Sequence, residues 1–285
     1  MIKLGDYQTL KIIKSVDFGL YLDGGEAGEI LLPQRYVTPS MLIGNEVEVF
    51  IYLDQDERPV ATTEKPFAKV GDFAYLEVAW TNHYGAFLKW GLMKDLFCPF
   101  REQKMRMEQG KSYIVYVKID EESYRLMATA KVDKYLSTPP VSGEDRLKHG
   151  DAVDVLIWQK TDLGFKCIVN NCYQGQIYDD QVFQPLRTGD KLTGYVDHVR
   201  EDGKIDITPQ PTGRKHTLDF AETLLRYLYE HDGCCELGDK SPAELIYDRF
   251  QVSKKAYKKA VGDLYKRHLI QISDEGIKLV EGNAK

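Results

Sequence analysis

Residues 71–88, GDFAYLEVAWTNHYGAFL, carry the spacing that decides the fold. The stretch opens on Gly71-Asp72, and Gly85 follows fourteen residues after Gly71. The same interval recurs before and after this stretch, and a further glycine lies twenty-five residues beyond each second one. The three sets of glycines are Gly5, Gly19 and Gly44; Gly71, Gly85 and Gly110; and Gly150, Gly164 and Gly189. Lone glycines mean little, but three matched sets indicate a domain repeated three times.

Each copy spans about 60–65 residues and is rich in short β-segments that end in glycine turns. In NEVEVFIYLD (45–54), the apolar residues Val47, Val49, Ile51 and Leu53 alternate, which is the period of a strand with one buried face. A basic residue and a threonine four positions later close each copy: Arg58 and Thr62, Arg125 and Thr129, Lys204 and Thr208. Evenly spaced short strands predict a small barrel, which closes its own sheet edges and can therefore be strung in tandem.

The residues after the third copy follow a helical period instead. Ala221, Leu224, Leu225 and Leu228 have helical spacing, and SPAE at 241–244 predicts the start of a second helix. Residues 253–266 predict a third helix capped by Ser253, and residues 270–280 predict two short strands. Three helices followed by a β-hairpin are the pattern of a winged helix.

The predicted fold is therefore mostly β with a small α+β C-terminal domain. Two stretches rich in proline, glycine and polar residues, 137–146 and 209–216, predict linkers. The predicted domains are a first barrel at 1–65, a second at 66–136, a linker at 137–148, a third barrel at 149–211 and a winged helix at 217–285.

The helix predicted at 253–266 has one strongly basic face. At 100° per residue, five lysines and a glycine fall within an arc of about 140°, and apolar residues fall opposite and should face the core. The members of the arc are Lys254, Lys255, Lys258, Lys259, Gly262 and Lys266. Like charges on one face repel, and glycine inside a helix costs ~1 kcal/mol relative to alanine. This arrangement favours a binding face at which an anion approaches the backbone, although a solvated lysine face is the plainer alternative.

The whole chain is acidic, with net charge −6 over 285 residues. An anionic partner must therefore meet a local patch rather than bulk charge. The five cysteines show no zinc-ribbon spacing, which favours a reduced, cytoplasmic protein. His231, Cys234 and Cys235 are grouped but lack an evident fourth ligand, so neither a metal site nor another cofactor is predicted. No apolar run reaches membrane-spanning length, so no membrane partner is expected.

Enzymatic motifs are absent from the sequence. GKS at 110–112 lacks the upstream glycine of a phosphate-binding loop, and GGEAG at 24–28 falls in an inter-strand turn rather than between a strand and a helix. We therefore expect no enzyme, no catalytic residue and no small-molecule substrate.

Together these features resemble the conserved virulence factor B family of bacterial RNA-binding regulators. The most specific matches are VSKKAYKKAVGDLYK (252–266), GLMKDLFCPFREQ (91–103) and the glycine framework. The resemblance implies three S1-type barrels of the five-stranded OB fold, followed by a winged helix. It also implies a non-enzymatic protein that binds single-stranded RNA and influences gene expression.

In an S1-type repeat, unpaired bases stack on aromatics around the first interior glycine, and a basic residue near the last turn meets phosphate. By position, the first repeat offers Phe18, Tyr21 and Arg58, and the second offers Tyr84, Phe87 and Arg125. The third has Leu163 at the first aromatic position and Lys166 at the second, with Phe165 beside Lys166. Tyr178 stands at the position of the family's histidine, and Arg200 and Lys204 lie on the final turn.

Charge ranks these repeats. Residues 1–65 carry 6 basic and 11 acidic groups, whereas residues 66–136 carry 11 and 9. The first repeat is thus the least suited to a phosphate backbone, because phosphate neutralisation dominates affinity. Two alternatives stay open: a DNA-binding transcription regulator that uses the winged helix, and an interaction module that docks on the ribosome or RNA polymerase. The basic arc carries no Arg, Asn or Gln for base readout, which favours RNA.

Overall fold

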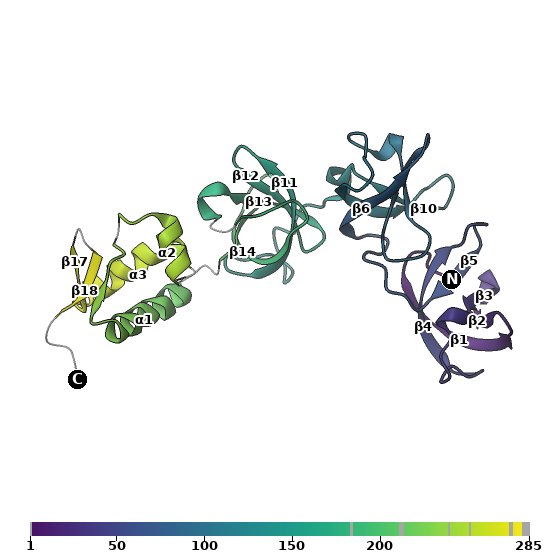
Figure 1. The fold of residues 1–285 in the computed structure, drawn as a ribbon, viewed down its shortest axis with the longest axis horizontal. Coiled ribbons are helices and arrows are strands. Elements are labelled where there is room, and N and C mark those ends of the chain that lie inside the picture. The colour runs from purple at the N-terminus through teal and green to yellow at the C-terminus, as the bar shows by residue number, and fades with distance from the viewer. Residues whose placement is uncertain are drawn as a thin grey trace. The chain divides into compact units, whose positions relative to one another are not determined.

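The computed structural model describes residues 2–182, 185–210, 214–238, 240–250, 252–273 and 276–280. The chain divides into two compact units, residues 1–136 and residues 137–285. The first unit holds two closed five-stranded barrels, and the second holds a third barrel and a small helical domain with a β-sheet (Figure 1). The predicted fold class is confirmed.

The three barrels share one strand order. In each, the first strand pairs with the second and with the fourth, and the fifth strand lies between the third and the fourth. The strands of the first barrel are β1 (Tyr7–Val16), β2 (Gly19–Asp23), β3 (Glu29–Pro33), β4 (Glu46–Leu53) and β5 (Pro59–Thr62). Those of the second are β6 (Phe73–Thr81), β7 (Gly85–Leu88), β8 (Leu96–Pro99), β9 (Ser112–Ile119) and β10 (Leu126–Thr129). Those of the third are β11 (Ala152–Thr161), β12 (Gly164–Val169), β13 (Tyr173–Tyr178), β14 (Lys191–Val199) and β15 (Ile205–Thr208).

The second glycine of each set has a steric reason. A Cβ at Gly19, Gly85 or Gly164 would lie 2.2, 2.4 or 2.1 Å from a backbone oxygen of the neighbouring strand. No side chain fits at that separation, so the close approach of two strands requires glycine there. The second glycine of each set is thus the point at which the second and third strands of the barrel come together.

The first two barrels share a core. On β4, Val49 and Ile51 point into the first barrel as the alternation predicts, but Phe50 and Tyr52 are buried as well and join the core of the second barrel. The rings of Phe50 and Trp90 meet edge to face at 5.8 Å. The first barrel is therefore fixed to the second by apolar packing across β4, which is why the first unit contains both.

The predicted linker of residues 137–148 partly belongs to the third barrel. Ser137 donates its backbone N–H to the carbonyl of Cys172 at 2.8 Å, and Leu147 packs against the core of that barrel. The region that follows the barrel contains α1 (Arg214–Glu230), β16 (Cys234–Cys235), α2 (Ala243–Phe250), α3 (Lys254–Lys266), β17 (Ile270–Ser273) and β18 (Gly276–Leu279).

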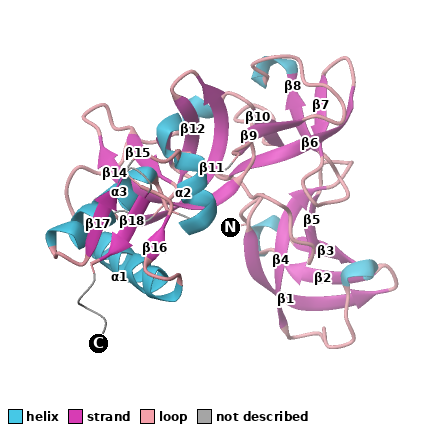
Figure 2. Ribbon diagram, turned by 60° about the vertical axis from the view of Figure 1, so that its left-hand side comes forward, coloured by secondary structure: helices cyan, strands magenta, loops and turns pink. Residues whose placement is uncertain are grey.

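These last elements form the expected winged helix. β17 pairs with β18, and β16 adds a short third strand (Figure 2). Its core gathers apolar residues from all three helices, among them Leu224, Ile246 and Tyr257. Among the helices that the structure describes, none is long and apolar enough to cross a membrane.

Candidate nucleic-acid interface

A row of three aromatic rings crosses the outer surface of the second barrel. Trp80 on β6 is paired with Phe87 on β7, and Phe87 is paired with Phe97 on β8. The rings of Trp80 and Phe87 stack at 3.7 Å with 4° between their planes, and Phe87 lies 4.9 Å from Phe97. Trp80 remains 43% exposed. We call these three residues the aromatic row.

A β-bulge aims Trp80 into this row. The pairing of β6 with β7 shifts by one residue between Val78 and Trp80, and such a shift re-aims the side chains beyond it. The indole Nε1 of Trp80 donates to the Asp95 carboxylate at 3.0 Å, which fixes the plane of the ring. The orientation of Trp80 is thus set by both the backbone and a hydrogen bond.

Tyr84 adds a fourth ring beside the row. The side-chain oxygen of Asn82 accepts hydrogen bonds from the backbone N–H groups of Tyr84 and Gly85, at 2.8 and 3.2 Å. This turn holds Tyr84 at the tip between β6 and β7, where 65% of it is exposed. The predicted residues Tyr84 and Phe87 therefore lie together, whereas Trp80 and Phe97 were not predicted.

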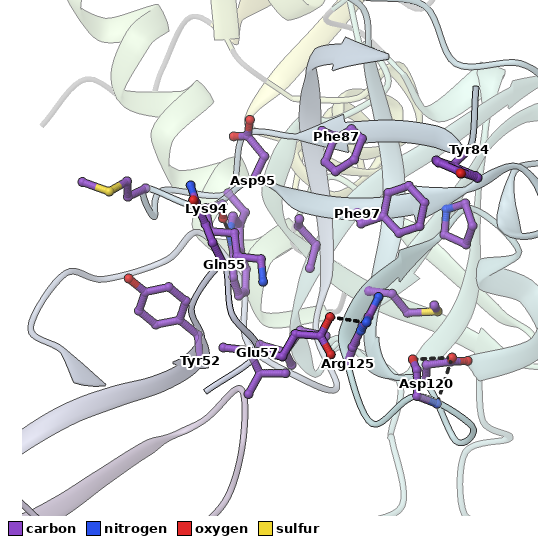
Figure 3. A pocket seen from close by; sticks show the side chains of 18 of the residues that line it. Tyr52, Gln55, Glu57, Tyr84, Phe87, Lys94, Asp95, Phe97, Asp120 and Arg125 are labelled. Carbon is purple, nitrogen blue, oxygen red and sulfur yellow. Dashed lines mark hydrogen bonds and ion pairs between the residues drawn. The ribbon is translucent and has the colours of Figure 1, made fainter. Parts of the chain in front are cut away.

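The aromatic row lines one side of a cavity of about 850 Å³. The turn between β4 and β5 of the first barrel lines the other side, so both barrels of the first unit contribute (Figure 3). The polar and charged residues of the lining are Gln55, Glu57, Lys94, Asp95, Arg101, Asp120, Ser123 and Arg125.

Each cation in this lining has a partner. Arg125, predicted to meet phosphate, forms an ion pair with Glu57 of the first barrel (Figure 3). Arg101 pairs with Asp120 at 3.1 Å. Lys94 donates to the backbone carbonyl of Asp54 at 2.6 Å, and desolvation lowers its pKa. The cavity therefore combines aromatic surface with neutralised charge.

Asp120 is held as a carboxylate at the edge of the cavity. The hydroxyl of Ser123 donates to it at 2.7 Å, and this hydrogen bond, helped by the nearby Arg101, lowers the pKa of Asp120. Asp120 thus holds the turn after β9 through Ser123 and also neutralises Arg101 at the edge of the cavity.

Only the second barrel has aromatics at all three positions of the row. The matching residues of the first barrel are Lys14, Tyr21 and Leu31, and those of the third are Gln159, Lys166 and Gln176. In the first barrel, Phe18 is 58% exposed and meets Tyr21 edge to face at 6.2 Å, while Arg58 pairs with Asp54 and Asp56. The strand register is the same in the three barrels at these positions, so the residue types alone distinguish them.

The third barrel buries one of the predicted binding residues. Phe165 is only 8% exposed and packs in the barrel core, with the Lys160 Nζ 4.3 Å from its ring. It alternates with Lys166, which points outward toward Trp158 at 5.7 Å, because successive residues of a strand face opposite sides. Its burial argues against base stacking by Phe165, whose role in binding stays a prediction.

Two other predicted residues of the third barrel, Arg200 and Lys204, each form an ion pair. The guanidinium of Arg200 donates to the Tyr178 hydroxyl at 2.6 Å, and its Nε donates to Asp206 at 2.9 Å. Lys204 pairs with Asp202 at 2.7 Å. Arg200 and Tyr178 are thus brought together as a unit, while Lys204 belongs to a separate turn.

Helix α3 presents the two faces that its period predicts. Tyr257, Ala260, Val261 and Leu264 are buried in the core. Ser253 caps the helix by accepting a hydrogen bond from the N–H of Ala256 at 3.1 Å. Exposed lysines occupy the opposite side: Lys255, Lys258, Lys259 and Lys266, with Lys254 half-buried beside them. A Cβ added at Gly262 would meet nothing within 4 Å, so open space lies over the backbone in the middle of this basic face.

No signal in the sequence alone places Trp80 and Phe97 in the aromatic row. Trp80 and Phe97 lie five residues before and twelve residues after Gly85, and their side chains share a face once the strands are paired. The bulge before Trp80 reverses the face expected from simple alternation.

Among the residues described, no group of three or more His, Cys, Asp or Glu side chains could hold a metal ion.

Comparison with known proteins matches both kinds of domain. Residues 4–64 match the model of the S1 domain, and residues 222–279 match that of the CvfB-like winged helix domain. An uncharacterised protein of Bacillus subtilis, YitL, is 28% identical over 92% of this chain and 89% of its own length. Conserved virulence factor B of Staphylococcus saprophyticus is 22% identical over 98% of this chain and 95% of its own.

A solved structure from Streptococcus pneumoniae, described as a multidomain protein with nucleic acid binding domains, is also similar. It is 19% identical and covers 97% of this chain and 98% of its own, with a TM-score of 0.42. That score is too low to establish a common arrangement of the domains.

Proposed function

We propose that this chain, a relative of the conserved virulence factor B proteins along nearly its whole length, binds single-stranded RNA and regulates gene expression without enzymatic activity. The aromatic row of Trp80, Phe87 and Phe97 carries the proposal, because a partly exposed stack of rings on a barrel surface suits unpaired bases. The S1 and winged-helix domains support nucleic-acid binding in general. The proposed location is the bacterial cytoplasm.

Base stacking is the proposed source of affinity in the first unit. Every base has a π-face, so a stack of protein rings binds single strands with little sequence preference, at about 1–3 kcal/mol per base. Tyr84 offers a further exposed ring beside the row. Duplex nucleic acid cannot use these rings without unstacking, which favours a single-stranded ligand.

The basic face of α3 is the proposed phosphate contact. Within the described ranges, Lys254, Lys255, Lys259 and Lys266 form no ion pair with an acidic side chain, in contrast to the cations at the final turns of the barrels, which are Arg58, Arg125, Arg200 and Lys204. Lysines without carboxylate partners release counterions when they bind phosphate, and this supplies affinity that falls with salt. Lys166 and the pair of Tyr178 with Arg200 are the corresponding proposal for the third barrel.

Fluorescence anisotropy on the full chain tests this proposal. The ligands are single-stranded RNA, single-stranded DNA and duplex DNA of equal length, each at two salt concentrations. We expect a preference for single-stranded RNA that weakens with salt. Preference for duplex DNA would instead support a transcription regulator that uses the winged helix, and absence of binding to all three would support a protein-interaction module.

Two variants of the same four lysines, one that removes their charge and one that keeps it, test the basic face. Replacement of Lys254, Lys255, Lys258 and Lys259 by Gln should flatten the salt dependence by about 0.7 in log–log slope for each phosphate that the variant no longer neutralises. Replacement of the same four lysines by Arg keeps the charge and should keep the slope. Equal slopes in the wild type and the Gln variant would remove the basic face from the proposal.

A further inference from the structure

The turn between β4 and β5 of the first barrel is built to present one carboxylate. The Asp54 side chain accepts hydrogen bonds from the backbone N–H groups of Asp56 and Arg58, both at 2.9 Å, which closes the turn. Glu57 lies at its tip with φ of 65°, a left-handed conformation that residues other than glycine seldom adopt. The third barrel has Gly203, with φ of 80°, in the corresponding turn. The second barrel has Tyr124, with φ of 55°, at the same point, so the left-handed conformation belongs to this turn in all three barrels and places Glu57 at its tip.

The turn is fixed against the second barrel at several points. Lys94 of the second barrel donates to the Asp54 carbonyl at 2.6 Å, and Trp90 packs on Phe50 of β4. The backbone N–H of Val70 donates to the Gly5 carbonyl at 2.9 Å, and a Cβ at Gly5 would lie only 2.3 Å from the Val70 side chain. Because the junction is packed, Glu57 is held at a set position relative to the cavity rather than on a free loop.

Glu57 reaches the guanidinium of Arg125, at the edge of the cavity lined by the aromatic row (Figure 3). A carboxylate and a phosphate offer a guanidinium the same arrangement of two oxygens, so they compete for it. Arg125 is 56% exposed in its side chain, and Glu57 is 47% exposed, so a ligand can reach both.

We propose that the cavity between the first two barrels is a composite site for an unpaired nucleotide, in which Glu57 occupies Arg125 until a backbone phosphate displaces it. The base would stack at the aromatic row, and the phosphate would take the guanidinium. The inference rests on the proposed function and adds the first barrel to it, as the part that weakens binding and makes it selective for ligands that supply both a base and a phosphate.

The test compares Glu57→Gln, Arg125→Gln and the double variant in the full chain. The probe is a fluorescein-labelled single-stranded RNA of roughly ten nucleotides, within the span of one OB-fold site. Glu57→Gln should bind the probe about twofold to fivefold more tightly at low salt, the ratio expected of one exposed charge contact. Its salt slope should match that of the wild type, because Arg125 meets the phosphate in both proteins once the ligand is bound. Arg125→Gln alone should weaken binding and flatten the slope by about 0.7, and in the double variant the affinity gain from Glu57→Gln should be absent.

Two controls separate this contact from general charge. Glu108→Gln removes the same charge from an exposed pair with Lys111 that does not line the cavity, and it should change affinity much less. Glu57→Asp keeps the charge but shortens the side chain, and it should recover part of the gain. Thermal unfolding of each variant shows that the fold is intact.

Three results would overturn the proposal: equal effects of Glu57→Gln and Glu108→Gln, a gain that persists without Arg125, or no gain at all. Wild-type binding reports separately on the proposed function. If the wild type binds RNA while Glu57→Gln binds no better, the composite site is wrong and the RNA-binding function stands. If neither the wild type nor any variant binds, both are wrong.

Discussion

Replacement of Gly262 by alanine should act in opposite directions on stability and on RNA affinity. Gly262 lies in the interior of α3, and an added Cβ would meet nothing within 4 Å, so the methyl group brings no clash. Glycine is about 0.8–1.0 kcal/mol less favourable than alanine in a helix interior. The variant should therefore be more stable by roughly 0.5–1 kcal/mol, which raises the Tm of a domain of this size by about 2–8 °C.

The same methyl group should weaken RNA binding. It would stand in the middle of the face formed by Lys254, Lys255, Lys258, Lys259 and Lys266, where we propose that a phosphate approaches the backbone. Because no charge changes, the affinity should fall without a change in the salt slope, unlike in the lysine variants.

Calorimetry and anisotropy on the full chain measure the two effects. The chain has several domains, so the transition of the winged helix is followed by itself rather than as one two-state event. Lys259→Ala is the matched control, since it adds alanine to the same face with little gain in helix propensity and should flatten the salt slope. A lower Tm for Gly262→Ala would refute the open space over the helix, and a higher Tm with unchanged affinity would refute the close approach of a ligand.

Three further predictions concern the barrels. Trp80→Ala should weaken RNA binding by about 1–3 kcal/mol, which anisotropy measures, whereas Trp80→Phe should restore most of it; binding equal to the wild type would exclude the aromatic row. Phe165→Leu should lower the free energy of unfolding, measured by chemical denaturation, by about 1 kcal/mol or more through poorer core packing, and it should leave RNA affinity unchanged. Unchanged stability with weaker RNA binding would instead support Phe165 as a binding residue. Asp120 has a pKa held below its ordinary value of 3.8, chiefly by Ser123, so its contribution to stability is present above that value and is lost as the pH falls below it. As the pH is lowered from about 5, the Tm of Asp120→Asn should therefore fall less steeply than the Tm of the wild type. Equal falls in Tm for the two proteins would contradict a stabilising role for the Asp120 carboxylate.

Local patterns were sufficient to predict the elements and the domains they form. The glycine intervals predicted three like barrels, because each strand approach admits no side chain at Gly19, Gly85 or Gly164. The helical period predicted which side of α3 is buried, because a helix turns by a constant angle and one face must meet the core. The positions of Tyr84 and Phe87 near the site followed from the same repeat.

The site as a whole depended on tertiary structure. Trp80 and Phe97 join Phe87 only through strand register and a bulge, neither of which a single strand specifies.

By itself, the sequence determined the repeats, the helix faces and the uneven distribution of charge, since these depend on spacing and composition along the chain. Only the tertiary structure decided that Phe50 packs in a second barrel and that Glu57 neutralises Arg125. Those contacts join residues distant in sequence, and the packing of one closed barrel on another brings them together.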